Sequence, residues 1–252
     1  MIKSIGGYYG GKATLRHQIA RWFPNHANFV SPFCGFASVE LFKPRSIREY
    51  LSDLNPGTIA ALKLIQRDPA TIVERLSRFE FSKMQFMTCS IALGNGASAL
   101  GIEALGISAI AYSAMANQRG GSVSGYSPQQ AARAKKRNWS YLHGVSERLQ
   151  GVELRCCPWQ EALKDPTPET FYYLDPPYLQ GGEHYQYPMS EVGHRELLER
   201  VTGNFPGKVA LSGYDSDLYR QYLEGWRKVE INAQDNKRRA RVECLWMNYE
   251  AP

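Results

Sequence analysis

Residues 171–178, FYYLDPPY, decide the fold of this sequence. The run FYYL is short, apolar and typical of a strand that is buried on both faces. Two prolines cannot supply ladder N–H groups, so the strand must end at Asp175. We expect the Asp175 carboxylate and the next backbone carbonyl to face outward from a stiff turn, with Tyr178 beside them. Two acceptors and a flat ring suit a planar amine, although a rigid turn with Asp175 as a helix cap would give the same pattern.

Segments around this motif alternate between strand-like and helix-like patterns. We expect strands over residues 27–31, 48–52, 152–156, 209–212, 229–232 and 243–249, and helices over residues 37–42, 58–66 and 190–204. Such alternation predicts an α/β fold with a parallel, doubly wound sheet. Residues 68–149 lack strand alternation, so we expect them to form a mainly helical insertion. Residues 1–67 and 150–252 would then share one α/β domain.

The composition is that of a globular protein. The chain has 252 residues, of which 43% are hydrophobic and 21% charged, which excludes a largely disordered or fibrous chain. The apolar stretch 86–116 is interrupted by Gly94, Asn95, Gly96 and Glu103, so buried helices are a better interpretation than a membrane span. No CxxC pair occurs, and no metal site is expected. We expect a cytoplasmic monomer with no secretory signal and no membrane contact.

Two more motifs follow predicted strands, where open α/β sheets bind their ligands. Residues 31–37, SPFCGFA, follow the first strand, and Gly35 would let the backbone approach a ligand closely. Asp53 ends the second strand, where a carboxylate either accepts hydrogen bonds from ribose hydroxyls or caps the next helix. The segment 6–12, GGYYGGK, is not a nucleotide-binding P-loop, because Ala13 stands where Ser or Thr is required.

Positive charge is concentrated in two segments of a chain with 30 basic and 24 acidic residues, a formal charge of +6. Residues 131–148 and residues 236–241 are both rich in Lys and Arg. A solvated surface would explain each segment, and so would contact with nucleic-acid phosphates.

Four motifs in one order, GGYYGGK, SPFCGFASVEL, LSDLN and DPPY, resemble those of the Dam-like, D12-type DNA adenine-N6 methyltransferases. The resemblance covers nearly the whole chain, including the closing segment 243–249. It implies a Rossmann-like sheet that binds S-adenosylmethionine, with residues 68–149 as an inserted target-recognition domain. The implied reaction transfers a methyl group from S-adenosylmethionine to adenine N6 in a specific double-stranded DNA sequence, after the base flips out.

The same resemblance implies roles for individual residues. The catalytic residues would be Asp175, Pro176, Pro177 and Tyr178. The cofactor would be bound by Tyr8, Lys12, Phe33, Gly35, Asp53, Trp159 and Asp175. Phosphate contacts would come from the basic middle segment, through Arg119, Arg133, Lys135, Lys136 and Arg137.

The sequence also departs from the family pattern. Ser31 stands where family members usually have Glu, Tyr8 where many have Trp, and Phe36 or Ala37 where they have a second glycine. Two other functions stay open. One is a methyltransferase acting on RNA or a protein amide, since related PPY-type motifs serve such substrates. The other, which the Ser31 departure leaves open, is a non-catalytic DNA-binding protein on a methyltransferase scaffold. His194, which follows the DPPY motif, is expected on a surface loop.

Overall fold

A computed structural model of the protein describes residues 5, 12–94, 101–116, 125–179, 186–234 and 240–250. Tyr8 and Arg119, which the sequence assigns to the cofactor and to DNA, lie outside these residues. The strands are β1 (Asn28–Ser31), β2 (Arg48–Asp53), β3 (Glu153–Cys156), β4 (Thr170–Leu174), β5 (Lys208–Gly213), β6 (Arg227–Gln234) and β7 (Ala240–Met247). The helices are α1 (Arg16–Ala20), α2 (Pro56–Arg67), α3 (Pro69–Ser77), α4 (Lys83–Gly94), α5 (Ile102–Met115), α6 (Pro128–Lys135), α7 (Leu142–Leu149), α8 (Trp159–Ala162), α9 (Glu191–Thr202) and α10 (Asp217–Tyr222), with a 3₁₀ turn at Trp139–Tyr141.

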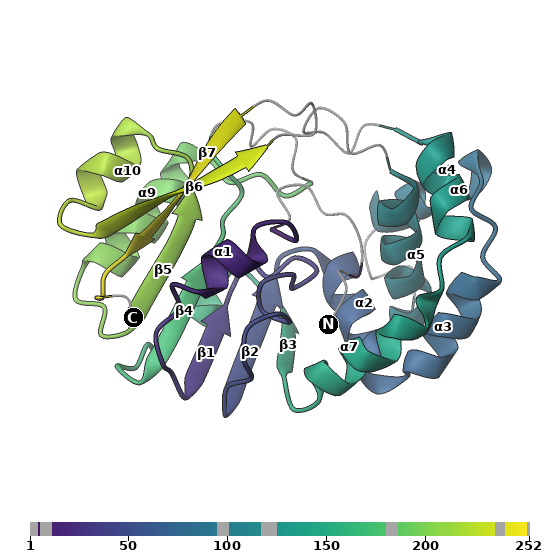
Figure 1. Ribbon diagram of the computed structural model, residues 1–252, viewed down its shortest axis with the longest axis horizontal. Coiled ribbons are helices and arrows are strands. Elements are labelled where there is room, and N and C mark those ends of the chain that lie inside the picture. The colour runs from purple at the N-terminus through teal and green to yellow at the C-terminus, as the bar shows by residue number, and fades with distance from the viewer. Residues whose placement is uncertain are drawn as a thin grey trace.

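Within the described residues the strands form one seven-stranded sheet of order β3-β2-β1-β4-β5-β7-β6. Strands β1 to β5 pair in parallel, and β7 runs antiparallel to both β5 and β6 (Figure 1). The predicted α/β fold is therefore confirmed, and every predicted strand is present. The sequence did not indicate that the last two strands form an antiparallel hairpin at one edge of the sheet.

The central strand β4 is buried on both faces. Phe171 and Tyr173 belong to the larger apolar core, and Tyr172 and Leu174 belong to a second core, which also contains residues of α9 and α10. Because side chains alternate between the faces of a strand, helices on both sides of the sheet require an unbroken apolar run here. This requirement explains the FYYL segment.

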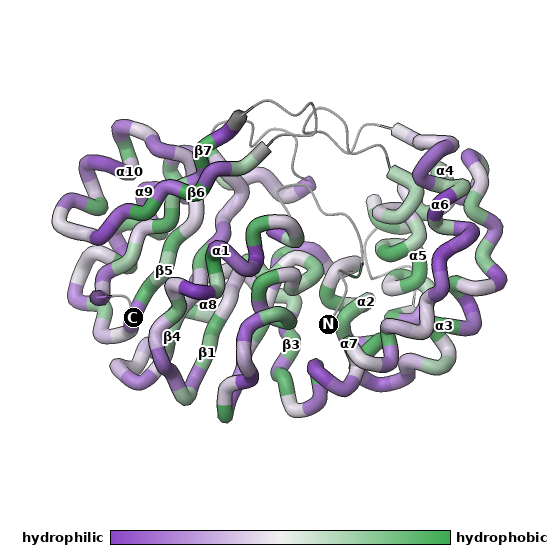
Figure 2. The backbone as a smooth tube through the Cα atoms, viewed as in Figure 1, coloured by the Kyte–Doolittle hydropathy of each residue, from purple (hydrophilic) through white to green (hydrophobic). Residues whose placement is uncertain are grey.

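The segment between β2 and β3 is helical and includes α2 to α7 (Figure 1). Helix α5 is apolar along most of its length and packs against α2 (Figure 2). The apolar stretch 86–116 thus forms parts of two helices, α4 and α5, in place of a single span. Among the described residues, no helix is both long enough and apolar enough to cross a membrane.

One side chain joins the end of α2 to the end of α7 and to the start of β3. The Nε2 atom of Gln66, at the end of α2, donates to the backbone oxygens of Leu149 (2.6 Å) and Val152 (2.8 Å). Leu149 ends α7, and Val152 immediately precedes β3. The chain therefore leaves the sheet and returns to it at neighbouring points.

The predicted helix over residues 37–42 is wrong, because this segment consists of turns. Ala37 has a φ of 54°, in the left-handed region, which is incompatible with the first turn of a right-handed helix. Pro44 then prevents the chain from continuing as a helix. The turns instead bring Glu40 next to Ser31, the last residue of β1.

His194 also differs from expectation, since it is fully buried and lies on α9. It shares one face of that helix with Leu197, Leu198 and Val201, at the spacing of a core-facing stripe. Its Nδ1 atom is 3.0 Å from the hydroxyl of Tyr219. Burial lowers the pKa of His194, as expected for an imidazole that packs in a core.

A buried ionic cluster connects α7 to β2. Glu49 of β2 is 2.6 Å from Lys43 Nζ and 2.5 Å from Arg148 Nη1 of α7. Burial alone would raise the pKa of Glu49. The hydrogen bonds from Arg148 and Lys43 more than offset this effect and lower the pKa to about 2. The carboxylate is therefore ionised, and it depends on both cations for compensation.

Replacing Arg148 with Met should lower the free energy of unfolding by about 3 kcal/mol, because one partner of a buried ion pair is removed. Urea denaturation would measure this change. Arg155→Met is the matched control, since the Arg155–Glu153 pair is exposed on β3, and the midpoint should hardly move. Equal effects of the two substitutions would contradict a structural role for the buried cluster.

Candidate active site

Three oxygen-bearing side chains lie at the carboxyl ends of neighbouring parallel strands. Ser31 ends β1, Asp53 ends β2, and Asp175 follows the last residue of β4. The strand order reverses between β1 and β4, which is the position where open α/β sheets form a ligand crevice. The topology therefore brings together residues that the sequence separates by more than a hundred positions.

Asp53 holds the loop after β1 in place. Its Oδ2 atom accepts the backbone N–H of Gly35 at 2.8 Å, and its Oδ1 atom accepts that of Asn55 at 2.9 Å. The helix cap of α2 is Asn55, whose side chain accepts from Gly57 and Thr58, so Asp53 itself is not the cap. Burial raises the pKa of Asp53 to about 6. A carboxylate has about four acceptor positions, so Asp53 retains capacity for a further donor.

Phe33 and Trp159 lie on the same side of the sheet, where both are half-buried and pack against the second core. Asp53 is the register partner of Cys156, and Trp159 begins α8 three residues later. Phe33, Gly35, Asp53 and Trp159 are thus distributed around the ends of β1, β2 and β3. Their assignment to a cofactor stays a prediction.

Lys12 and the DPPY motif meet directly. Lys12 Nζ lies 2.9 Å from Asp175 Oδ1, 3.7 Å from Glu243 Oε2 and 4.6 Å from the centre of the Tyr178 ring. The hydroxyl of Tyr178 donates to Glu243 Oε2 at 3.1 Å. Burial raises the pKa of Asp175, Lys12 opposes this rise, and the nearby Glu243 carboxylate adds to it.

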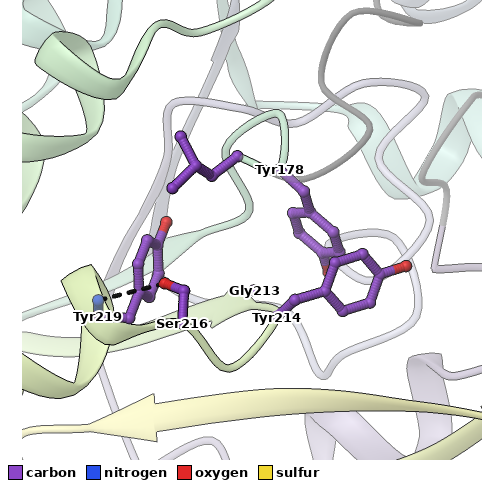
Figure 3. A pocket seen from close by; sticks show the side chains of 6 residues that line it. Tyr178, Gly213, Tyr214, Ser216 and Tyr219 are labelled. Atoms are coloured by element: carbon purple, nitrogen blue, oxygen red, sulfur yellow. Dashed lines mark hydrogen bonds between the residues drawn. The ribbon is translucent and has the colours of Figure 1, made fainter.

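A small pocket opens beside this group (Figure 3). Its lining includes Tyr178, Tyr214, Ser216 and Tyr219. The rings of Tyr178 and Tyr214 meet edge to face, with their centres 4.5 Å apart. On the opposite side, the N–H of Tyr219 donates to Ser216 Oγ at 3.3 Å. The pocket therefore combines aromatic surface with hydroxyl groups next to Asp175.

Glu40 is a buried carboxylate that the sequence analysis did not single out. Its side chain accepts from Ser31 Oγ at 2.8 Å and from the N–H of Val39 at 3.1 Å, and the residue is only 4% exposed. Burial is the main reason that its pKa is raised to about 7, and the charge of Asp175 raises it further. A carboxylate is therefore present beside Ser31, where the family pattern has Glu in place of Ser. The signal was the Glu within the quoted segment SPFCGFASVEL.

The basic residues predicted to contact DNA lie on α6 and in the turn after it. Arg133, Lys135 and Lys136 are exposed. Arg137 is half-buried, with its guanidinium 4.9 Å from the centre of the Trp139 ring. In the described parts of the chain, no group of His, Cys, Asp and Glu is arranged to hold a metal ion.

Replacing Glu40 with Gln should change stability in a pH-dependent way. Between pH 4.5, where a free Glu titrates, and about 7, folded Glu40 holds a proton that the unfolded chain has released. The contribution of Glu40 to the free energy of unfolding therefore falls as pH rises through 7. The stability of Glu40→Gln relative to wild type should increase from pH 5 to pH 8 by on the order of 3 kcal/mol.

Urea denaturation at the two pH values would measure this difference, and Glu161→Gln on the exposed side of α8 controls for the substitution itself. The same relative stability of Glu40→Gln at both pH values would contradict the assignment.

Comparison with known proteins identifies a family for this chain. Among curated proteins, no individual protein matches. Precorrin 8w decarboxylase from Methanobacterium thermoautotrophicum is a similar solved structure, with a TM-score of 0.40 and 12% identity over 94% of this chain and 90% of that one. Precorrin-6y C5,15-methyltransferase from Geobacter metallireducens has a TM-score of 0.38 and 9% identity over 93% and 86% of the two chains.

Residues 8–237 match the family described as D12 class N6 adenine-specific DNA methyltransferase. This match spans most of the chain and includes Asp53 and Asp175, which lie at the carboxyl ends of β2 and β4. The protein therefore belongs to the D12 class N6 adenine-specific DNA methyltransferases, which use S-adenosylmethionine to methylate adenine in DNA.

Proposed function

We propose that the protein methylates the N6 atom of an adenine that is flipped out of a specific double-stranded DNA sequence. The observation that carries this proposal is the position of Asp175. It follows β4 at the switch point of the sheet and is followed by a rigid Pro176-Pro177 turn and the Tyr178 ring. The buried carboxylates around it, Asp53 and Glu40, complete an acidic crevice.

The crevice suits S-adenosylmethionine, which carries positive charge on its sulfonium and ammonium groups. Glu40 and Asp53 both have raised pKa values because burial disfavours their charged forms, and a bound cation would offset that cost. Asp53 and Gly35 would hold the ribose end, and Phe33 and Trp159 would line the adenine end. Lys12, and Tyr8 outside the described residues, would complete the site. When bound, the cofactor supplies an electrophilic methyl group.

The proposed role of Asp175 follows from the chemistry of the target amine. The N6 lone pair of adenine is delocalised into the ring, so the amine is a poor nucleophile. An ionised Asp175 and the carbonyl of Pro176 would accept hydrogen bonds from the two N6 hydrogens. These bonds favour a tetrahedral nitrogen with a localised lone pair, and positioning next to the methyl donor supplies much of the rate.

Base flipping is required because N6 is inaccessible to this chemistry inside the duplex. Tyr178 would stack on the extruded base. The Tyr178 side chain is only 5% exposed and its ring touches Tyr214, so entry of a base requires the Tyr214 ring to move.

Residues 68–149 are proposed as the target-recognition domain. Arg133, Lys135, Lys136 and Arg137, together with Arg119 outside the described residues, would contact phosphates. Contacts with base edges in this domain would select the sequence.

Replacing Asp175 with Asn should reduce turnover by about tenfold or more, because a neutral amide oxygen accepts a hydrogen bond from the target amine more weakly than a charged carboxylate does. Transfer of labelled methyl groups to unmethylated DNA would measure the loss. Asp165→Asn is the matched control, since Asp165 is exposed and is also followed by a proline. Near-normal turnover by Asp175→Asn would refute the catalytic assignment.

Calorimetry with S-adenosylmethionine distinguishes the alternatives. A non-catalytic DNA-binding protein need not bind the cofactor, whereas an RNA or protein-amide methyltransferase would bind it and leave DNA unmodified.

Replacing both Lys135 and Lys136 with Gln should weaken DNA binding equally for all sequences. Two phosphate contacts would be lost, so the slope of log K against log salt should become shallower by about 2. Fluorescence anisotropy over a salt series would measure the slope. Lys164→Gln with Lys208→Gln removes two exposed lysines elsewhere, and an equal change in that variant would contradict a specific role for α6.

A further inference from the structure

We propose that Glu243 is a positioning residue that fixes Tyr178 and Lys12 around Asp175 and connects the β6–β7 hairpin to the base site. This inference rests on the proposed function. Glu243 lies on β7, opposite Ile231 of β6 in the antiparallel register. Ligand-binding residues of open α/β sheets usually lie at the carboxyl ends of parallel strands. Glu243 does not, because it lies within the antiparallel strand β7.

Glu243 lies in a group of four side chains in contact, which we call the Lys12 cluster: Lys12, Asp175, Tyr178 and Glu243. One oxygen of Glu243, Oε2, accepts the Tyr178 hydroxyl at 3.1 Å and lies 3.7 Å from Lys12 Nζ. The same ammonium group contacts Asp175 and lies over the Tyr178 ring. Lys12 therefore contacts the three other members, and Glu243 is the member that accepts the Tyr178 hydroxyl.

The Glu243 side chain is only 15% exposed, and that of Lys12 is 3% exposed. Hydrogen bonds to charged groups in such surroundings are stronger than those between neutral groups. A fixed Tyr178 ring is useful for stacking, since less conformational freedom is lost when a base binds.

The hairpin offers a second contact with the same aromatic pair. Arg241 and Glu243 are two residues apart on β7, so they point to the same face. The guanidinium of Arg241 lies 5.2 Å from the centre of the Tyr214 ring, and Glu243 bonds Tyr178. One strand thus contacts both Tyr178 and Tyr214, two of the residues that line the pocket. A displacement of the hairpin by DNA would be transmitted directly to Tyr178 and Tyr214.

Glu243 also acts on Asp175 through charge, since its carboxylate raises the pKa of Asp175 while Lys12 lowers it. Three other groups that act on Asp175 are not altered by a substitution at position 243: Glu40 after β1, Tyr173 on β4 and Tyr219 on α10. Tyr178 in the turn also acts on Asp175 and bonds Glu243 directly, and Glu243→Gln keeps an acceptor for it. Because Asp175 must be ionised to accept from the amine, the loss of the Glu243 charge should let it ionise at lower pH.

The test compares single variants of the full chain with S-adenosylmethionine and unmethylated DNA: Glu243→Gln, Glu243→Ala, Glu230→Gln and Tyr178→Phe. The double variant Tyr178→Phe with Glu243→Ala completes the set. Glu230 is the control, an exposed glutamate on the neighbouring strand of the same hairpin, paired with Lys228. Single-turnover methyl transfer is measured against pH, cofactor affinity by calorimetry, and folding by circular dichroism.

For Glu243→Gln, the acidic limb of the pH profile should shift to lower pH, because the neutral amide still accepts from Tyr178 but no longer opposes ionisation of Asp175. For Glu243→Ala, the single-turnover rate should fall about tenfold with little change in cofactor affinity, since a hydrogen bond to a charged group is lost. In a Tyr178→Phe background, which already lacks that bond, Glu243→Ala should have a smaller effect.

The inference would be overturned by an unshifted pH profile in Glu243→Gln, or by an equal loss of rate from Glu243→Ala with and without the Tyr178 hydroxyl. In either case, methyl transfer by the wild-type protein would still support the proposed function. A wild-type protein that binds cofactor and DNA without methyl transfer would refute the proposed function, and the inference with it.

Discussion

The parallel pairing of β4 with β1 determines where the candidate site of this protein lies. Val30 is the register partner of Tyr172, although more than a hundred residues separate them in the chain. This pairing places the end of the FYYL strand next to the end of β1, at the point where the strand order reverses. Asp175, Ser31 and, one strand further, Asp53 therefore lie at the same edge of the sheet. The apolar run of β4 is the condition for this arrangement, because only a strand covered on both faces can occupy the middle of the sheet.

The crevice concentrates negative charge where solvation is poor. Glu40, Asp53 and Asp175 all have raised pKa values, and burial is the first cause in each case. Backbone N–H groups compensate Asp53, a hydroxyl and an N–H compensate Glu40, and an ammonium group compensates Asp175. Ionisation therefore remains costly at Glu40 and Asp53, which have neutral donors. A site of this kind gains most from a positively charged ligand, and the family uses a cationic cofactor.

The sequence predicted the strands and the main motifs because these depend on local patterns. Short apolar runs next to Pro or Gly located β1, β4 and β5, and the DPPY motif marked the end of β4 correctly. The segment 37–42 was mispredicted because its left-handed start at Ala37 is not encoded by hydrophobicity. The resemblance placed Lys12, Asp175 and Tyr178 in one site, but Glu243 was missed because it reaches them only through the tertiary fold, and no period or spacing relates it to Asp175. The buried His194 was missed because its surroundings come from two helices and the sheet. The assignments of cofactor and DNA contacts rest on resemblance and stay predictions.

The Gln66 side chain donates two hydrogen bonds, to the backbone oxygens of Leu149 and Val152, and so links the two ends of the segment 68–149. The segment 68–149 therefore begins and ends at neighbouring points beside β3. The entropic cost of closing a loop grows only slowly with its length, so insertions or exchanges within this segment, away from its contacts with α2 and β2, place little thermodynamic burden on strand pairing. Such an architecture allows the helical segment to vary in length while the strands that carry the candidate site keep their register.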